Sequence, residues 1–212
     1  MNDTDFHTDR AFIELDLIAL RHNAEILQNA MPQNCRLMAV VKCNAYGHGS
    51  ILIAKELQKI GVQSFAVATA DEGIDLRRHG IRGEILVLGY TAVLRAEELQ
   101  KYNLMQTVID FAYAEALQKT GVSLNVHIKL DTGMHRLGIP FDAMEAVKAV
   151  FSMPNLQVCG MYTHLCCADS LAPDDTTFTE AQIERFYQSV SALKADGIPI
   201  PKLHIQSSYG LL

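Results

Sequence analysis

A lysine stands at the end of an apolar run in the segment Ala39–Gly49. Burying an ammonium group is costly unless the group is paired or loses its proton. A lysine amine without its proton attacks aldehydes and forms a Schiff base. Gly47 and Gly49 permit a tight loop after Lys42, and the hydroxyl of Tyr46 can bind an anionic group. The segment therefore indicates an aldehyde-binding amine. The alternative is a lysine that only extends from a strand end into solvent.

A second charged segment, Lys129–Gly138, follows another apolar run and holds Lys129, Asp131 and Arg136. At the end of a parallel strand these charges would share one face with Lys42. An arginine there offers a fixed cationic donor to an oxygen anion. The alternative is an ordinary Asp–Arg ion pair in a loop.

Two later segments place polar side chains after apolar runs. His164 follows one run, and Ser207 and Ser208 follow the last. Small hydroxyl residues after the late strands of a barrel suit a phosphate group. A lone histidine at a strand end is more often structural than catalytic. Cys166 and Cys167 are expected to be small buried residues rather than nucleophiles.

The elements that position these residues alternate between short apolar runs and amphipathic stretches, a pattern that predicts βαβ crossovers and a parallel sheet. Strands are expected at Leu37–Cys43, Ser64–Thr69, Glu84–Leu88, Met105–Ile109, Leu124–Leu130, Gln157–Thr163 and Lys202–Ser207. Helices are expected at Leu17–Ala30, Ile51–Ile60, Phe111–Thr120, Phe141–Phe151 and Thr179–Ala195, with another beginning after Thr69.

Several of these helices have residues before them that can cap their first turn. Asp16, Ser50, Thr69 and Asp110 are the expected N-caps. Thr69 and Glu72 also have the spacing of a capping box, in which each side chain binds the other residue's backbone N–H.

The strand count indicates the fold class. A (β/α)8 TIM barrel needs eight strands and about 250 residues, whereas seven strands are expected here. We therefore expect an α/β barrel without its eighth strand. The strand-like run Ala11–Asp16 has no place in this series and is expected to pair outside the barrel. The predicted division is 1–36 for the N-terminal strand and helix and 37–212 for the truncated barrel.

Composition narrows the function classes. The 212 residues are 49% hydrophobic and 20% charged, with a formal net charge of −6. The absence of a dense basic run argues against nucleic acid and anionic membranes as partners. No apolar stretch reaches the roughly 20 residues of a membrane span, and the polar start is unlike a signal peptide. The five cysteines have no CxxC spacing, which favours reduced thiols in a cytoplasmic protein without a metal site.

Taken together, the two lysine-containing segments resemble those of the bacterial alanine racemases, which use pyridoxal 5′-phosphate (PLP). The resemblance implies that Lys42 forms a Schiff base with PLP and acts as one catalytic base, and that Tyr46 contacts the PLP phosphate. It implies that Arg136 contacts the phenolic oxygen of PLP and the substrate carboxylate. Lys129 matches a lysine that is often carbamylated and orients that arginine, and Met134 is expected at the substrate.

The later segments extend the resemblance. They imply that His164 lies beneath the cofactor in a hydrogen-bond network and that Ser208 binds the phosphate. Ser207 stands where these racemases usually have asparagine. This difference and the pair Cys166–Cys167 resemble most the serine/alanine racemases of vancomycin-resistance gene clusters, whose racemase module is attached to a membrane domain.

The family resemblance implies a reaction that interconverts L- and D-serine or L- and D-alanine through an α-carbanion, supplying D-amino acid for cell-wall precursors. The second base in this family is a tyrosine of a C-terminal β-domain, contributed by the partner subunit of a homodimer. It is expected outside these residues, so the isolated chain should racemise little. Two alternatives stay open: a PLP-dependent decarboxylase with the same barrel, whose resemblance is limited to Ala39–Asn44, and a non-catalytic PLP-binding barrel.

Overall fold

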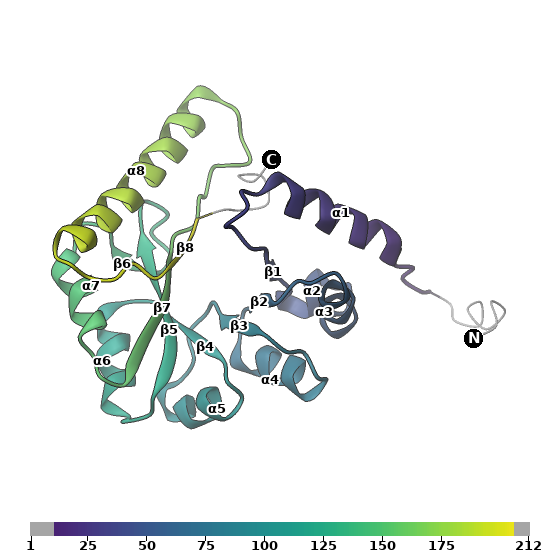
Figure 1. Cartoon of the computed structure of the whole chain (residues 1–212), viewed down its shortest axis with the longest axis horizontal. Helices are drawn as coiled ribbons and strands as arrows, with labels where there is room; N and C mark the ends of the chain where they lie inside the picture. Colours follow the sequence, from purple (N-terminus) through teal and green to yellow (C-terminus); the bar gives the residue numbers. More distant parts are fainter. Residues whose placement is uncertain (1–10, 206–212) are drawn as a thin grey trace.

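The computed structural model describes residues 11–205. A parallel sheet curls through the molecule in the order β1-β2-β3-β4-β5-β7-β8, with β6 paired to β5 (Figure 1). The strands are β1 (Met38–Val40), β2 (Ser64–Val67), β3 (Glu84–Val87), β4 (Met105–Val108), β5 (Leu124–Asp131), β6 (Ile139–Pro140), β7 (Leu156–Tyr162) and β8 (Lys202–His204). Within the described range, β1 and β8 end this order and do not pair with each other. The predicted parallel barrel fold is confirmed, with the seven expected strands present.

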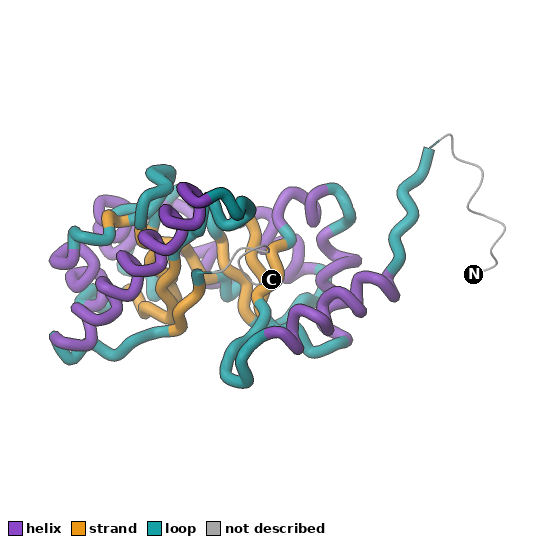
Figure 2. Tube along the Cα trace, turned by 90° about the horizontal axis from the view of Figure 1, so that it is seen from above, coloured by secondary structure: helices purple, strands orange, loops and turns teal. Residues whose placement is uncertain are grey.

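The helices lie outside the strands, as the view from above shows (Figure 2). They are α1 (Leu17–Ala30), α2 (Lys42–Tyr46), α3 (Ser50–Lys59), α4 (Ala70–Arg78), the 3₁₀ turn η1 (Val93–Arg95), α5 (Ala96–Lys101), α6 (Phe111–Lys119), α7 (Met144–Phe151) and α8 (Pro173–Ala195). Among residues 11–205, no helix has both the length and the apolarity needed to cross a bilayer.

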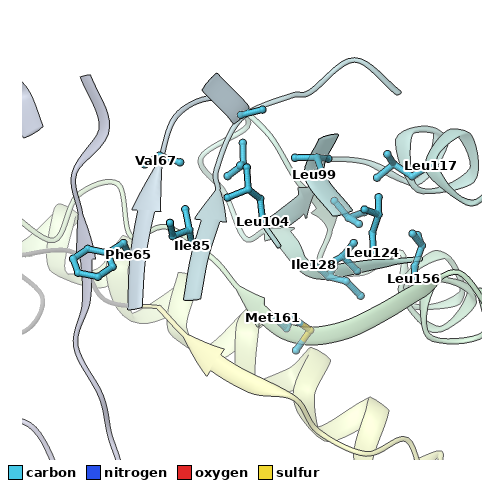
Figure 3. Packing of buried hydrophobic residues seen from close by; sticks show 14 of the residues in the cluster. Phe65, Val67, Ile85, Leu99, Leu104, Leu117, Leu124, Ile128, Leu156 and Met161 are labelled. Carbon is cyan, nitrogen blue, oxygen red and sulfur yellow. The ribbon is translucent and has the colours of Figure 1, made fainter. Parts of the chain in front are cut away.

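Alternation along the strands divides the core into two layers. The larger layer lies between sheet and helices and includes Phe65, Ile85 and Ile128, all fully buried (Figure 3). A smaller cluster with Ala66 and Tyr162 belongs to the other face of the strands. Successive side chains of a strand point to opposite faces. In β5 the apolar residues therefore pack under the helices, and His127 and Lys129 occupy the inner face of the curled sheet.

Local spacing predicted three of the four helix caps correctly. Asp16 accepts hydrogen bonds from the N–H groups of Ile18 and Ala19, and Asp110 accepts one from Tyr113. Thr69 forms the expected capping box with Glu72. The prediction for Ser50 is wrong: Ser50 is the first residue of α3, and its N–H binds the side chain of Asn44 instead.

Several expected elements differ from the structure, among them the helix expected from Phe141, which begins at Met144. Ala11–Asp16 forms no strand: Ile13 is 75% exposed, and the stretch runs away from the sheet that could supply a partner (Figure 2). The first barrel strand ends at Val40 rather than Cys43, because the chain turns sharply after it. Helix α8 begins at Pro173, six positions before the expected start, because proline suits the first helical position. The division at residue 36 stays a prediction.

Candidate active site

A left-handed turn begins after Lys42, at the carboxyl end of β1. Cys43, Asn44 and Ala45 have φ of 52–54° and ψ of 45–49°, and Tyr46 has φ of 55°. These are the angles of a left-handed helix, which costs L-residues roughly 1–2 kcal/mol each. Hydrogen bonds hold the turn, among them Ala45 N–H to the carbonyl of Val41 at 2.9 Å. Such concentrated strain is typical of functional sites.

The side chains of this turn remain accessible. Lys42 is half-buried rather than buried, and its ammonium lies 6.0 Å from the ring centroid of Tyr46. Tyr46 is 61% exposed. Partial burial raises the pKa of the Tyr46 hydroxyl, and the nearby Cys43 thiol raises it further. The phenol therefore keeps its proton at neutral pH and can donate a hydrogen bond to an anion.

Lys129 occupies the inner face of β5 and is only 3% exposed. Its ammonium lies 5.7 Å from the ring centroid of Tyr162 and donates one long hydrogen bond, 3.4 Å, to the carbonyl of Leu130. Within residues 11–205 no carboxylate forms an ion pair with it. Burial lowers the pKa of Lys129 to about 8, although Asp131 opposes the shift, and the charge of Arg136 lowers it further.

The loop after β5 is shaped by Asp131. Its carboxylate accepts hydrogen bonds from the N–H groups of Gly133 and His135, both at 3.0 Å, and contacts His135 Nδ1 at 2.9 Å. At Gly138, with φ of 125°, a Cβ atom would lie 2.6 Å from the Asp131 nitrogen, so only glycine fits. The loop leaves Arg136 exposed. Because Asp131 pairs with His135, the Asp–Arg ion pair considered from the sequence is not the role of this carboxylate.

Half-buried Met134 lies two residues before Arg136 in the same loop. Its expected place at the substrate stays a prediction.

His164 follows β7 and is half-buried. Its pKa is lowered by burial first, and then by the positive charges of Arg136, Lys129 and Lys42. Three cations, from the turn after β1, from β5 and from the loop after β5, therefore act on one imidazole. The structure thus brings these four predicted site residues into one electrostatic neighbourhood, in which the charges of the three cations reach the imidazole.

Two side chains of α8 hold the loops of this neighbourhood together. Gln182 is fully buried and donates to Thr132 Oγ1 at 3.3 Å and to the carbonyl of His164 at 3.1 Å. Its carbonyl oxygen accepts the N–H of Cys166 at 3.1 Å. Arg185 donates to the carbonyl of Thr132 at 2.8 Å. Neither residue was among those predicted from the sequence. The helical spacing could have indicated that Gln182 is buried, because it lies four residues before Phe186 and therefore on the same, buried face of α8.

A histidine pair lies below the cations on the inner face. His127 Nδ1 lies 2.9 Å from His204 Nε2, and the His204 ring stacks on Tyr162 with centroids 4.5 Å apart. Burial lowers the pKa of His127 to about 4 and that of His204 to about 3. Both imidazoles are therefore neutral at physiological pH, and burial raises the pKa of Tyr162 to about 12.

The remaining predicted features have different outcomes. Ser207 and Ser208 lie outside the described residues. Cys166 and Cys167 are half-buried rather than buried, with their sulfur atoms 3.8 Å apart.

Cavities of about 330 and 360 Å³ lie at the opposite, amino-terminal ends of the strands, near Leu124 and Ser64. Residues 11–205 hold no cluster of three or more metal-ligating side chains.

Comparison with known proteins identifies the family. A family model described as the alanine racemase N-terminal domain matches residues 15–212. The chain is 49% identical over 204 residues to an amino-acid racemase of Enterococcus faecalis, covering 96% of this chain and 29% of that protein. It is 41% identical over 203 residues to a serine/alanine racemase of Enterococcus gallinarum, with the same coverage of 96% and 29%.

A solved structure gives the same result. The alanine racemase of Clostridium difficile 630 in complex with cycloserine superposes with a TM-score of 0.85 at 30% identity, over 91% of this chain and 54% of that one. The barrel fold of this chain is thus shared with a solved alanine racemase. The chain belongs to the alanine racemase family and matches its N-terminal domain, as the sequence motifs predicted. It spans less than a third of the two enterococcal relatives.

Proposed function

We propose that this chain is the cofactor-binding barrel of a PLP-dependent racemase that interconverts the L- and D-forms of serine, alanine or both. The observation that supports this most directly is the position of Lys42 just after β1, with Lys129 buried on the inner face of β5. A serine/alanine racemase and an amino-acid racemase among the relatives favour small amino acids as substrates. Supply of D-amino acid to cell-wall precursors, with a link to vancomycin resistance, is part of the same proposal.

The residues present fit PLP, which has an aldehyde, a phosphate and a phenolic oxygen. Lys42 offers a half-buried primary amine for the aldehyde. The Tyr46 hydroxyl, whose pKa is raised, is a donor for the phosphate, and Ser207 and Ser208 are proposed to join it there. Arg136 supplies the cation for the phenolic oxygen or the substrate carboxylate, since guanidinium binds such oxygens through a fixed set of donors.

When bound, PLP supplies an electron sink for the electron pair left behind as a proton leaves the substrate α-carbon. The protein must then remove and return that proton on opposite faces of the carbon. Lys42 is proposed to move the proton on one face. The base for the other face is proposed to be a tyrosine from a second domain of the partner subunit in a homodimer. His164, kept neutral by burial and by its cationic neighbours, is proposed to hold a hydrogen bond beneath the cofactor without adding charge.

Lys129 is proposed to carry a carbamate. A pKa of about 8 leaves roughly a quarter of the amine neutral near pH 7.5. The neutral amine adds to carbon dioxide, forming a C–N bond and releasing one proton. The product is an anion beside Arg136, so repulsion between two cations becomes attraction.

The experiment that tests the function has two arms. Incubation with PLP followed by borohydride reduction and peptide mapping should place the label on Lys42, and the Lys42→Ala variant should lose it. Chiral chromatography should detect D-serine or D-alanine formed from the L-form by the complete enzyme, and little from the isolated 212 residues. Label on another residue, or carbon dioxide release in place of racemisation, would contradict the proposal.

We propose that these residues act in the cytoplasm. In a longer protein, a membrane domain elsewhere in the chain would hold them at the inner face of the membrane. Within residues 11–205 the structure contains no helix that could cross a bilayer.

A further inference from the structure

The left-handed turn after Lys42 needs support from outside itself. Four successive residues with side chains hold φ between 52° and 55°. Two side-chain bonds within the segment 42–50 contribute: Asn44 Oδ1 accepts from Ser50 N–H at 2.9 Å, and His48 Nδ1 lies 2.8 Å from the Ala45 carbonyl. These bonds join parts of the same loop and do not tie its first residue to the rest of the barrel.

Glu72 provides such a tie. One carboxylate oxygen accepts the N–H of Cys43, the first residue of the left-handed turn, at 2.6 Å. The other oxygen accepts the N–H groups of Ala68 at 2.7 Å and Thr69 at 3.3 Å, at the start of α4. One half-buried side chain thus links the segment after β1 to the neighbouring β2–α4 connection.

The chemistry of this link requires a carboxylate. Both oxygens face backbone N–H donors, so both must accept hydrogen bonds. A glutamine of the same shape would keep its single oxygen at the two N–H groups of Ala68 and Thr69. Its NH₂ group would then face the N–H of Cys43, and that bond would be lost. A negative charge at the first turn of α4 is also favoured by the helix dipole.

We propose that Glu72 is a positioning residue for Lys42: its carboxylate fixes the N–H of Cys43, holds the turn in its left-handed form and keeps the lysine amine directed toward the cofactor. The consequence for Lys42 rests on the proposed function. The bond to the Cys43 N–H and its effect on the turn are independent of the proposed function. This role is additional to the capping box, which needs only Thr69 and Glu72.

The test compares Glu72→Gln with Thr69→Ala. Thr69 Oγ1 accepts Glu72 N–H at 3.3 Å, so Thr69→Ala also damages the capping box but leaves Cys43 untouched. Amide hydrogen exchange should accelerate at Cys43 in Glu72→Gln by about tenfold, the effect expected for losing one charge-assisted hydrogen bond. The rate of borohydride-trapped PLP labelling at Lys42 should fall by a similar factor. Thr69→Ala should change neither by more than about twofold.

A rescue variant separates positioning from general stability. Glycine adopts positive φ without strain, so Cys43→Gly in the Glu72→Gln protein should recover Lys42 labelling to near the level of Cys43→Gly alone. Urea unfolding of all variants measures their global stability alongside.

Three outcomes would overturn the inference: unchanged exchange at Cys43 in Glu72→Gln, equal loss of labelling in Glu72→Gln and Thr69→Ala, or no rescue by Cys43→Gly. Failure of the unaltered chain to label Lys42 with PLP would instead overturn the proposed function, and the Lys42 part of the inference with it. Normal labelling of the unaltered chain together with normal labelling of Glu72→Gln would overturn the inference alone.

Discussion

The buried histidine pair should make this fold lose stability in mild acid. The native pKa of His127 is about 4 and that of His204 about 3, whereas an unfolded histidine titrates near 6.5. Below about pH 6.5 the unfolded chain therefore binds more protons than the native chain, and the free energy of unfolding falls as the pH falls. Above that pH the contribution of the pair is fully present.

The size of the effect follows from these values. For His127, lowering the pH from about 7.5 to about 5 should remove about 2 kcal/mol from the free energy of unfolding, and His204 adds to the loss. Carboxylates with lowered pKa act in a separate range, because their stabilisation is lost only below about pH 4.5; these are Glu56, Asp71, Glu84 and Asp131.

Urea unfolding followed by circular dichroism over this pH range measures the effect. The His127→Gln variant should lose a large part of the pH dependence, because one of the two titrating rings is gone. His22→Gln is the matched control, since His22 is exposed on α1, and it should keep the full dependence. His164 is present in all three proteins, so its contribution cancels. Equal pH dependence in His127→Gln and the unaltered chain would refute the reasoning.

Three further predictions concern the same inner face and its supports. Gly160→Ala should lower the free energy of unfolding by about 2 kcal/mol or more in urea titration, because the new Cβ would lie 2.4–2.6 Å from the ring atoms of His127. Gln182→Ala should lower the free energy of unfolding by about 2–4 kcal/mol, because the buried groups that Gln182 binds lose their partner. Gln188→Ala, at an exposed position of the same helix, should change it by no more than about 0.5 kcal/mol. Equal values for the two variants would contradict the role of Gln182. With ¹³C-bicarbonate, NMR should detect a carbamate carbon that Lys129→Ala abolishes, and an unchanged signal would exclude Lys129 as the carrier.

Local sequence determined much of the fold. Caps such as Asp16 and Thr69 act over two or three residues, so their spacing alone predicted them correctly. The apolar runs predicted every strand of the barrel series because both faces of a parallel sheet are covered. The strand prediction for Ala11–Asp16 was wrong, because its residue types suit a strand but a strand forms only where a neighbouring strand pairs with it.

The residues of the candidate site could be proposed from sequence motifs, but their geometry could not. The motifs identified Lys42, Lys129, Arg136 and His164, which the structure brings into one electrostatic neighbourhood. The left-handed turn was not predictable, because residues with side chains ordinarily avoid it and its support comes from Glu72 in the next βα unit. Gln182 was missed for a related reason: its partners belong to loops far away in the sequence.

The close approach of Gly160 to the His127 ring also restricts how this barrel can diverge. A larger residue at position 160 can be accepted only after position 127 has become smaller, so the order of the two changes matters. In directed evolution, libraries that vary position 160 alone should return almost only glycine, whereas libraries that vary both positions together should yield folded combinations with neither parental residue.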